Sequence, residues 1–218
     1  MTHTGERTRK TSRRRADILA AALDTYVESG DSGTFVQQVC ARAGVSVGTL
    51  YHHFGSKDLL LATLHYTILN DYQSGAGALL AADPPAEQGI RETVAYHLRW
   101  LVHHPRPATF LLQQPFAGYR SPDVAPELLA ENDAFLSTVK GWLQRRMSAG
   151  ELKDLPFEVV TAVLIGPVHH WARSALYRGT PSPGAVRTAI GELSDASWQG
   201  LRPAGPRSPR PSGTPRTK

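Results

Sequence analysis

The feature that most constrains this chain is a glycine between two short apolar segments near its N-terminus. Gly44 follows one segment of helical spacing, and only Val45 and Ser46 separate it from the next. Glycine readily adopts the left-handed conformation that ends a helix, and serine is a preferred cap at a helix start. Two short helices joined by a turn of three or four residues form a helix-turn-helix. The pattern therefore predicts this motif, with its second helix at residues 47–54.

Helices on either side would complete a small N-terminal domain. Residues 12–29 have apolar side chains at three- and four-residue spacing, which indicates one amphipathic helix. Thr34, with Gln37 three positions later, has the sequence of a capping box and predicts the start of the next helix. Ser56 is expected to cap a further helix over residues 56–73.

The rest of the chain also shows helical spacing, and we find no convincing strand pattern. Glycines and prolines in residues 75–85 predict a short irregular segment. Prolines then mark the starts of most later segments, as expected for a residue tolerated in the first helical turn. The expected helices cover residues 86–103, 105–114, 126–149, 156–177 and 183–199. The sequence therefore predicts an all-α fold.

Charge is concentrated at the two ends of the chain. Residues 1–15 hold six basic residues and one acidic residue, and residues 200–218 hold five basic residues and no acidic one. Because the whole chain has a net charge of +5, residues 16–199 are acidic overall. Basic ends are typical of contacts with a polyanion. Solvated tails are the alternative, which we prefer for residues 201–218, a proline-rich segment that we expect to be disordered.

Composition and motif content disfavour several classes of protein. Cys40 is the only cysteine, which excludes an internal disulfide, fits a cytoplasmic location and suggests a small core residue. The longest nearly apolar run, residues 159–168, is too short to span a membrane. The chain has no phosphate-binding glycine loop, nucleophile elbow or pair of zinc ligands at helical spacing. We therefore expect no enzymatic activity, no cofactor and no metal.

Residues 34–60, TFVQQVCARAGVSVGTLYHHFGSKDLL, closely resemble the DNA-binding signature of the TetR family of bacterial repressors. With the preceding helix, the resemblance covers residues 12–60, and the rest of the chain is similar only in size and helical character. The matching positions are Thr34, Val39, Ala43, Gly44, Val45, Ser46, Gly48, Thr49, Leu50, Tyr51, His53, Phe54, Ser56, Lys57 and Leu60.

The resemblance implies that the helix at residues 47–54 lies in the major groove of DNA. Leu50 and Phe54 are expected to face inward, with Val39 and Val45 completing a small core. Hydroxyl, imidazole and ammonium groups suit phosphate oxygens, and valine or threonine methyls suit thymine. The alternative for the two histidines is a half-buried surface without a DNA contact. The candidate DNA contacts are Arg13, Arg14, Thr34, Ser46, Val47, Thr49, Tyr51, His52, His53 and Lys57.

The charge of the motif departs from the family pattern. Val47 stands where the family often has lysine or another polar residue. Residues 16–60 hold five acidic residues and only two basic ones, Arg42 and Lys57, for a net charge of −3. Such a module is poorly equipped to neutralise phosphates. We therefore expect the basic residues at positions 7–15 to supply most of the attraction to DNA.

The C-terminal helices suggest a ligand cavity and a dimer interface. A cavity lined by aromatic side chains with a few polar groups suits a mainly apolar small molecule. Pro167 should weaken its helix beside His169, so we favour that region. Candidate ligand contacts are His97, Trp100, His103, Phe110, Gln113, Phe116, Tyr119, Trp142, His169 and Trp171.

An apolar stripe on the last helix, with a second one on the helix before it, would form a four-helix bundle across a two-fold axis. The alternative is that the stripes only close the core of one chain. The stripe residues are Val186, Ile190, Leu193 and Ser197, with Val159, Val163, Ala172 and Leu176 on the preceding helix.

These observations favour a cytoplasmic transcription regulator that binds a palindromic operator in double-stranded DNA as a homodimer. As in much of the family, it would be a repressor released by an apolar small-molecule effector. The alternative is a DNA-binding regulator without such a ligand, controlled by a protein partner or by its own level. The expected organisation is a basic arm at 1–11, a helix-turn-helix domain at 12–60, a helical ligand-binding and dimerisation domain at 61–200, and a basic tail at 201–218.

Overall fold

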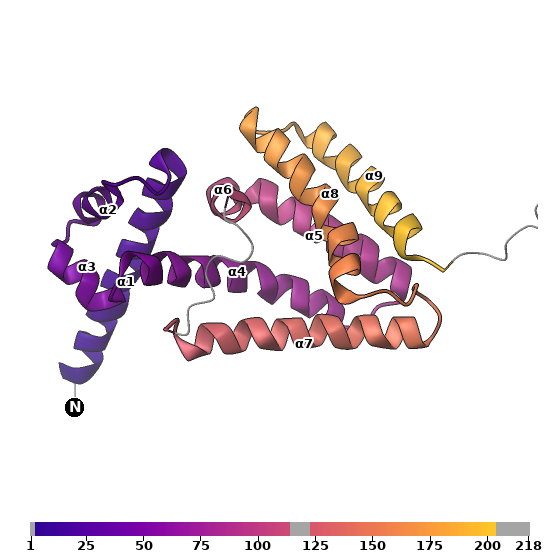
Figure 1. Cartoon of the computed structure of the whole chain (residues 1–218), viewed down its shortest axis with the longest axis horizontal. Coiled ribbons are helices and arrows are strands. Elements are labelled where there is room, and N and C mark those ends of the chain that lie inside the picture. Colours follow the sequence, from indigo (N-terminus) through magenta and orange to yellow (C-terminus); the bar gives the residue numbers. More distant parts are fainter. Residues whose placement is uncertain (1–2, 114–122, 204–218) are drawn as a thin grey trace, which may run out of the picture.

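The computed structural model describes residues 3–113 and 123–203, and these residues are helical with no strand (Figure 1). The prediction of an all-α fold is confirmed. None of the helices in these two ranges has the length and hydropathy that a bilayer span requires. The helices are α1 (His3–Ser29), α2 (Phe35–Ala43), α3 (Val47–Phe54), α4 (Lys57–Ala81), α5 (Ala86–His103), α6 (Pro105–Gln113), α7 (Pro126–Ser148), α8 (Phe157–Tyr177) and α9 (Pro183–Leu201).

The predicted helix-turn-helix is present as α2 and α3. Gly44 has φ 62° and ψ 40°, the left-handed conformation that ends α2. Ser46 is the N-cap of α3, and its Oγ accepts a hydrogen bond from the Thr49 backbone N–H at 3.1 Å. Ser56 caps α4 in the same way through the Leu59 N–H. The turn and both of its flanking caps therefore follow from local sequence.

The predicted capping box at the start of α2 is wrong. The Thr34 side chain makes no capping hydrogen bond, and its backbone, at φ −101° and ψ 6°, is not in the extended conformation that capping requires. Its Oγ1 instead accepts a hydrogen bond from Gln38 Nε2 at 3.0 Å, one helical turn along.

Two helices are longer than predicted. α1 begins at His3 and not near Ser12, so the basic N-terminal segment continues the helix without a break. α4 continues to Ala81, so only residues 82–85 of the segment that we expected to be irregular lie outside a helix. Gly75 lies beside Tyr96 of α5, where an added Cβ would be 2.7 Å from the ring Cζ. Glycine at this position therefore allows two helices to approach closely and does not end one.

The remaining helices form the body of the molecule around α5. α4 runs from the N-terminal three helices into this body and lies beside α7, while α8 and α9 pack on the other side of α5 (Figure 1). Trp142 of α7 is 1% exposed, and its indole N–H donates to the Pro84 carbonyl at 3.0 Å. We expected the C-terminal tail to begin at residue 201. Leu201 is instead the last residue of α9 and is buried. Residues 204–218 of the predicted tail lie outside the described residues.

Candidate nucleic-acid interface

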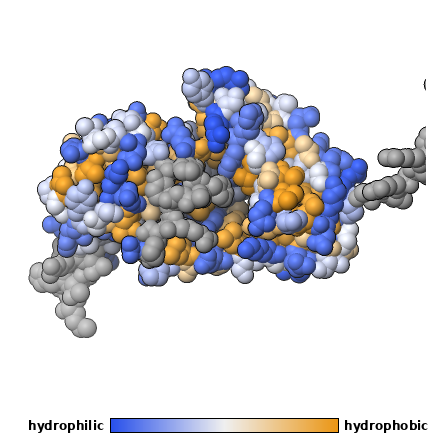
Figure 2. All heavy atoms as spheres, viewed as in Figure 1, coloured by the Kyte–Doolittle hydropathy of each residue, from blue (hydrophilic) through white to orange (hydrophobic). Residues whose placement is uncertain are grey.

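The outward face of α3 exposes large side chains that a helix normally buries. Val47 and Tyr51, one turn apart, are 42% and 40% exposed, and His52 next to them is also exposed. On the opposite face Leu50 and Phe54 are buried, with Val39 from α2. The surface formed by α1–α3 mixes apolar and hydrophilic residues (Figure 2). Such a face can offer both methyl groups and hydrogen-bonding groups to a partner.

The start of α3 is held by two hydroxyl groups. Ser46 Oγ lies 2.9 Å from Thr49 Oγ1, in addition to accepting the Thr49 N–H. A hydroxyl has one donor and two acceptor sites, so neither group is saturated by this contact. The pair therefore fixes the first turn of α3 and keeps polar capacity at the surface.

Arg15 joins the basic start of α1 to the end of α3. Its Nη1 donates to the His53 carbonyl at 2.7 Å, and its guanidinium carbon lies 4.4 Å from the centroid of the Phe54 ring. Burial lowers the pKa of this guanidinium from its ordinary value. The sequence did not single out Arg15, because its partners lie 38 and 39 positions away. Arg13 and Arg14, the candidates next to it, are exposed and half-buried respectively.

His53 lies in a basic environment at the end of α3. Its pKa is lowered first by burial and then by His52, Arg15 and Arg14. The neutral form is therefore favoured near pH 7. A neutral imidazole keeps one N–H that can donate to a phosphate oxygen, but it adds no charge.

Both basic residues within positions 16–60 are paired with acidic side chains. Lys57 Nζ lies 2.9 Å and 3.0 Å from the two carboxylate oxygens of Asp31, which raises the lysine pKa. Arg42 is bonded to Glu28 and lies 3.7 Å from Asp24. The charges of Lys57 and Arg42 are therefore largely compensated within the domain.

An ion-pair cluster joins this domain to the body. Arg106 of α6 pairs with Asp24 at 2.8 Å and with Glu28 at 3.0 Å, and the same two acids contact Arg42. Hydrogen bonds from Arg42 and Arg106 lower the pKa of Glu28 to about 2. Beside the cluster, Tyr26 meets Phe110 edge to face, with ring centroids 4.8 Å apart. α1 is therefore fixed to α6 by both charge and aromatic contact.

The structure brings together only some of the predicted ligand contacts. His97 lies against His169, with ring centroids 5.0 Å apart, and Tyr72 connects His97 to Trp100. Trp142 packs instead against Gly89, eight residues or about 12 Å along α5 from His97. Phe110 is buried and Trp171 half-buried, whereas His103 and Gln113 are exposed. Phe116 and Tyr119 lie outside the described residues.

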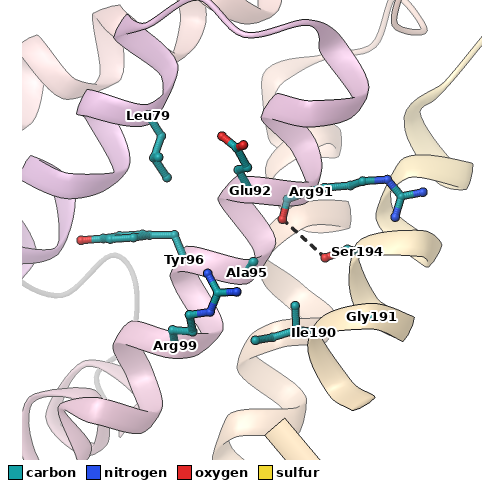
Figure 3. Close-up of a pocket in the computed structure, with 9 residues that line it drawn as sticks. All are labelled: Leu79, Arg91, Glu92, Ala95, Tyr96, Arg99, Ile190, Gly191 and Ser194. Atoms are coloured by element: carbon teal, nitrogen blue, oxygen red, sulfur yellow. Dashed lines mark hydrogen bonds between the residues drawn. The ribbon is translucent and has the colours of Figure 1, made fainter. Parts of the chain in front are cut away.

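A surface groove of about 610 Å³ lies between α4, α5 and α9 (Figure 3). Within it Arg91 pairs with Glu87 and Asp195, and Ser194 Oγ donates to the Arg91 carbonyl. None of the predicted ligand contacts within residues 3–113 and 123–203 lines this groove. Its lining residues are Leu79, Arg91, Glu92, Ala95, Tyr96, Arg99, Ile190, Gly191 and Ser194.

The predicted dimer residues on α9 already pack within one chain. Val186, Ile190 and Leu193 are half-buried against the core. On α8, by contrast, Val159 is 42% exposed and Tyr177 is 92% exposed. The outward apolar surface of this helix pair therefore belongs more to α8 than to the predicted α9 stripe.

The chain is similar in sequence and fold to known bacterial regulators. The family "Bacterial regulatory proteins, tetR family" matches residues 18–64. The HTH-type transcriptional regulator RutR of Escherichia coli K12 is 25% identical over 169 residues, 78% of each protein. The HTH-type transcriptional repressor NicS of Pseudomonas putida is 34% identical over 110 residues, 50% of this chain and 51% of that protein. A TetR family transcription regulator from Marinobacter aquaeolei superposes with a TM-score of 0.69 at 19% identity, covering 87% of this chain and 97% of that one.

Proposed function

Because this chain belongs to the TetR family of bacterial transcription regulators, we propose that it represses transcription as a homodimer bound to a palindromic operator. The observation that carries the proposal is the outward face of α3. Val47, Tyr51 and His52 are exposed on a helix whose start is fixed by a capped turn. A helix of this kind fits the major groove, where valine contacts thymine methyls and the polar tips reach phosphates.

The N-terminal half of α1 supplies the electrostatic attraction in this proposal. Lys57 and Arg42 are neutralised by acids, so unpaired positive charge must come from residues 7–15. Arg15 fixes this segment against the end of α3, on the side of the domain that carries the reading helix. Lys57 then serves mainly to hold α4 to the loop that contains Asp31.

The body is proposed to dimerise and to bind an effector. Pairing two copies through α8 and α9 would present two reading helices to successive major grooves. The effector would act through α4 and α6, two elements of the body that contact α1. It can change DNA affinity only by preferring a spacing of the two reading helices that does not fit the operator.

The test is DNA binding by the purified full chain. Fluorescence anisotropy compares a duplex from upstream of its own coding sequence, containing an inverted repeat, with a random duplex of equal length. We expect preferential binding to the repeat by a dimer. Tyr51→Ala should weaken binding by about 10- to 100-fold, the value of a hydrogen bond to a charged phosphate group. His52→Ala should also weaken it.

His103→Ala is the matched control, because His103 is an exposed histidine on α5 of the body. It should leave DNA binding unchanged. A monomeric protein with equal affinity for both duplexes at moderate salt contradicts the proposal. A dimer that prefers the repeat but responds to no small molecule favours control by a partner protein or by its own level.

A further inference from the structure

His97 of α5 is a buried polar side chain without a hydrogen-bond partner. It is 5% exposed, and neither Nδ1 nor Nε2 makes a hydrogen bond. Buried polar groups are nearly always bonded, since an orphaned donor or acceptor loses its interaction with water and gains nothing in return. Two orphaned nitrogens on one ring therefore require an explanation beyond packing.

The surroundings of His97 are aromatic and come from three helices. His169 of α8 lies 5.0 Å away between ring centroids, and Tyr72 of α4 meets His97 edge to face at 4.9 Å. Trp100, one turn further along α5, meets Tyr72 at 5.4 Å. Pro167 interrupts the backbone hydrogen bonds of α8 two residues before His169. His97 and His169 therefore lie among aromatic side chains, next to a helix that Pro167 weakens.

The charge around the pair is one-sided. Burial and His169 lower the pKa of His97 to about 3, and burial and Arg173 lower that of His169 to about 4. No acidic side chain in residues 3–113 and 123–203 contributes to either shift. Asp71, beside Tyr72 on α4, accepts the indole N–H of Trp100 at 3.3 Å. His104 stacks on Trp100. The group therefore holds two neutral imidazoles and the guanidinium of Arg173, while the Asp71 carboxylate beside it bonds to Trp100 and contributes to the pKa of neither histidine.

We infer that His97 and His169 bind the carboxylate of an acidic effector, a monocarboxylic acid with an apolar body. This inference rests on the proposed function and specifies its ligand class. The carboxylate oxygens would accept hydrogen bonds from the imidazole N–H groups, and the aromatic side chains would cover the apolar body. A neutral hydrocarbon would leave the nitrogens of His97 orphaned, and a cation would be repelled by Arg173.

Binding of the acid takes up a proton. The carboxylate enters as an anion, and one imidazole gains a proton from solvent to form an imidazolium next to it. No covalent bond is made or broken. An adjacent negative charge favours the charged imidazole, which reverses the effect of burial. Because solvent does not reach the His97 nitrogens, entry of the acid also requires side chains around the pair to move.

The experiment is calorimetric titration of the full chain with straight-chain and phenyl-substituted monocarboxylic acids, and with their amides as uncharged controls. Each titration is repeated at pH 7 in two buffers of different ionisation enthalpy. We expect the acids to bind at least about 10-fold more tightly than their amides, the value of a hydrogen bond to a charged group. The buffers should report uptake of about one proton per bound acid. Amides that bind as well as the acids, or no acid binding at all, overturn the inference.

Variants separate charge from shape. His97→Gln and His169→Gln keep a hydrogen-bonding side chain that cannot become charged, so acid binding should weaken by about 10- to 100-fold and proton uptake should fall. His170→Gln, at the exposed neighbouring position on α8, is the matched control and should bind as the wild type does. Equal losses for acid and amide in His97→Gln and His169→Gln would mean that the pair only shapes the site.

DNA binding, measured without any acid, keeps the two proposals distinct. If the chain prefers the inverted repeat but binds acids no better than amides, only the ligand class is wrong. If it binds acids with proton uptake but shows no preference for the repeat, the operator-binding function is wrong and the carboxylate site stands.

Discussion

Among single residues, the two basic side chains within positions 16–60 are both paired with acids of the same domain. Lys57, at the start of α4, forms an ion pair with Asp31, which lies in the loop between α1 and α2. Arg42 is engaged by Glu28 and Asp24. An exposed pair of this kind contributes little to stability, but it removes a positive charge from the surface that a phosphate would meet. In the proposed function, Asp31 would therefore limit what Lys57 contributes to DNA binding.

Asp31→Asn should release Lys57 for contact with DNA. We expect tighter DNA binding and a steeper salt dependence, with the slope of log K against log salt increasing by about 0.9 for one added phosphate contact. Anisotropy titrations at several salt concentrations measure the slope. Asp133→Asn changes the net charge equally on an exposed position of α7 and is the control. Equal slopes for the two variants would show that Lys57 does not reach a phosphate.

At the scale of helices, local signals were sufficient for the turn and insufficient for α4. Gly44 and Ser46 act within a few residues of their own positions, so the helix-turn-helix could be read from the sequence. The role of Gly75 could not be predicted in this way, because it depends on Tyr96, 21 positions away. The Tyr96 hydroxyl also donates a hydrogen bond to the Tyr72 carbonyl. Glycine is common both in breaks and in close helix contacts, and only tertiary structure distinguishes them.

The candidate sites show the same limit. Exposure of Val47 and burial of Leu50 follow from helical period alone. The contact between His97 and His169 joins α5 to α8, and period does not determine which faces of two helices meet. We grouped Trp142 with them because of its residue type. In the structure Trp142 of α7 packs against Gly89, at a different point along α5 from His97. Long-range pairing was therefore the part that sequence reasoning could not supply.

The continuous α1 gives the basic N-terminal segment a defined direction. Deleting residues 1–11 removes Arg7, Arg9 and Lys10 and keeps Arg15 with its contacts to α3. We expect the salt slope of DNA binding to fall by up to about 3, since each lost phosphate contact accounts for about 0.9. Binding should weaken most at low salt, where the lost phosphate contacts contribute most. An unchanged slope would rule out a DNA contact by this segment.

At the scale of the whole molecule, the buried histidines couple stability to pH. The folded-state pKa of His97, about 3, lies below the ordinary value of 6.5, so the unfolded chain binds a proton first as the pH falls. Stability is therefore fully present above pH 6.5 and is lost progressively below it. At pH 5 the loss from this one residue amounts to up to about 2 kcal/mol.

Urea unfolding at pH 7 and at pH 5 measures this loss. His97→Gln should be less sensitive to pH than the wild-type protein, by up to about 2 kcal/mol in the difference between the two conditions. His170→Gln, on the exposed side of α8, should retain the wild-type dependence. If His97→Gln loses as much stability on acidification as the wild type, the imidazole is not held neutral in the folded state.

The unbroken course of α4 has a mechanical consequence. Its 25 residues make a rod about 37 Å long. The helix-turn-helix domain lies at one end of this rod, and α7 packs along the other end. A tilt of only about 5° at the body end would displace the helix-turn-helix domain by about 3 Å, close to the rise of one base pair, about 3.4 Å. In a dimer, small side-chain rearrangements in the body would therefore change the distance between the two α3 helices. That distance would then no longer match the spacing of successive major grooves.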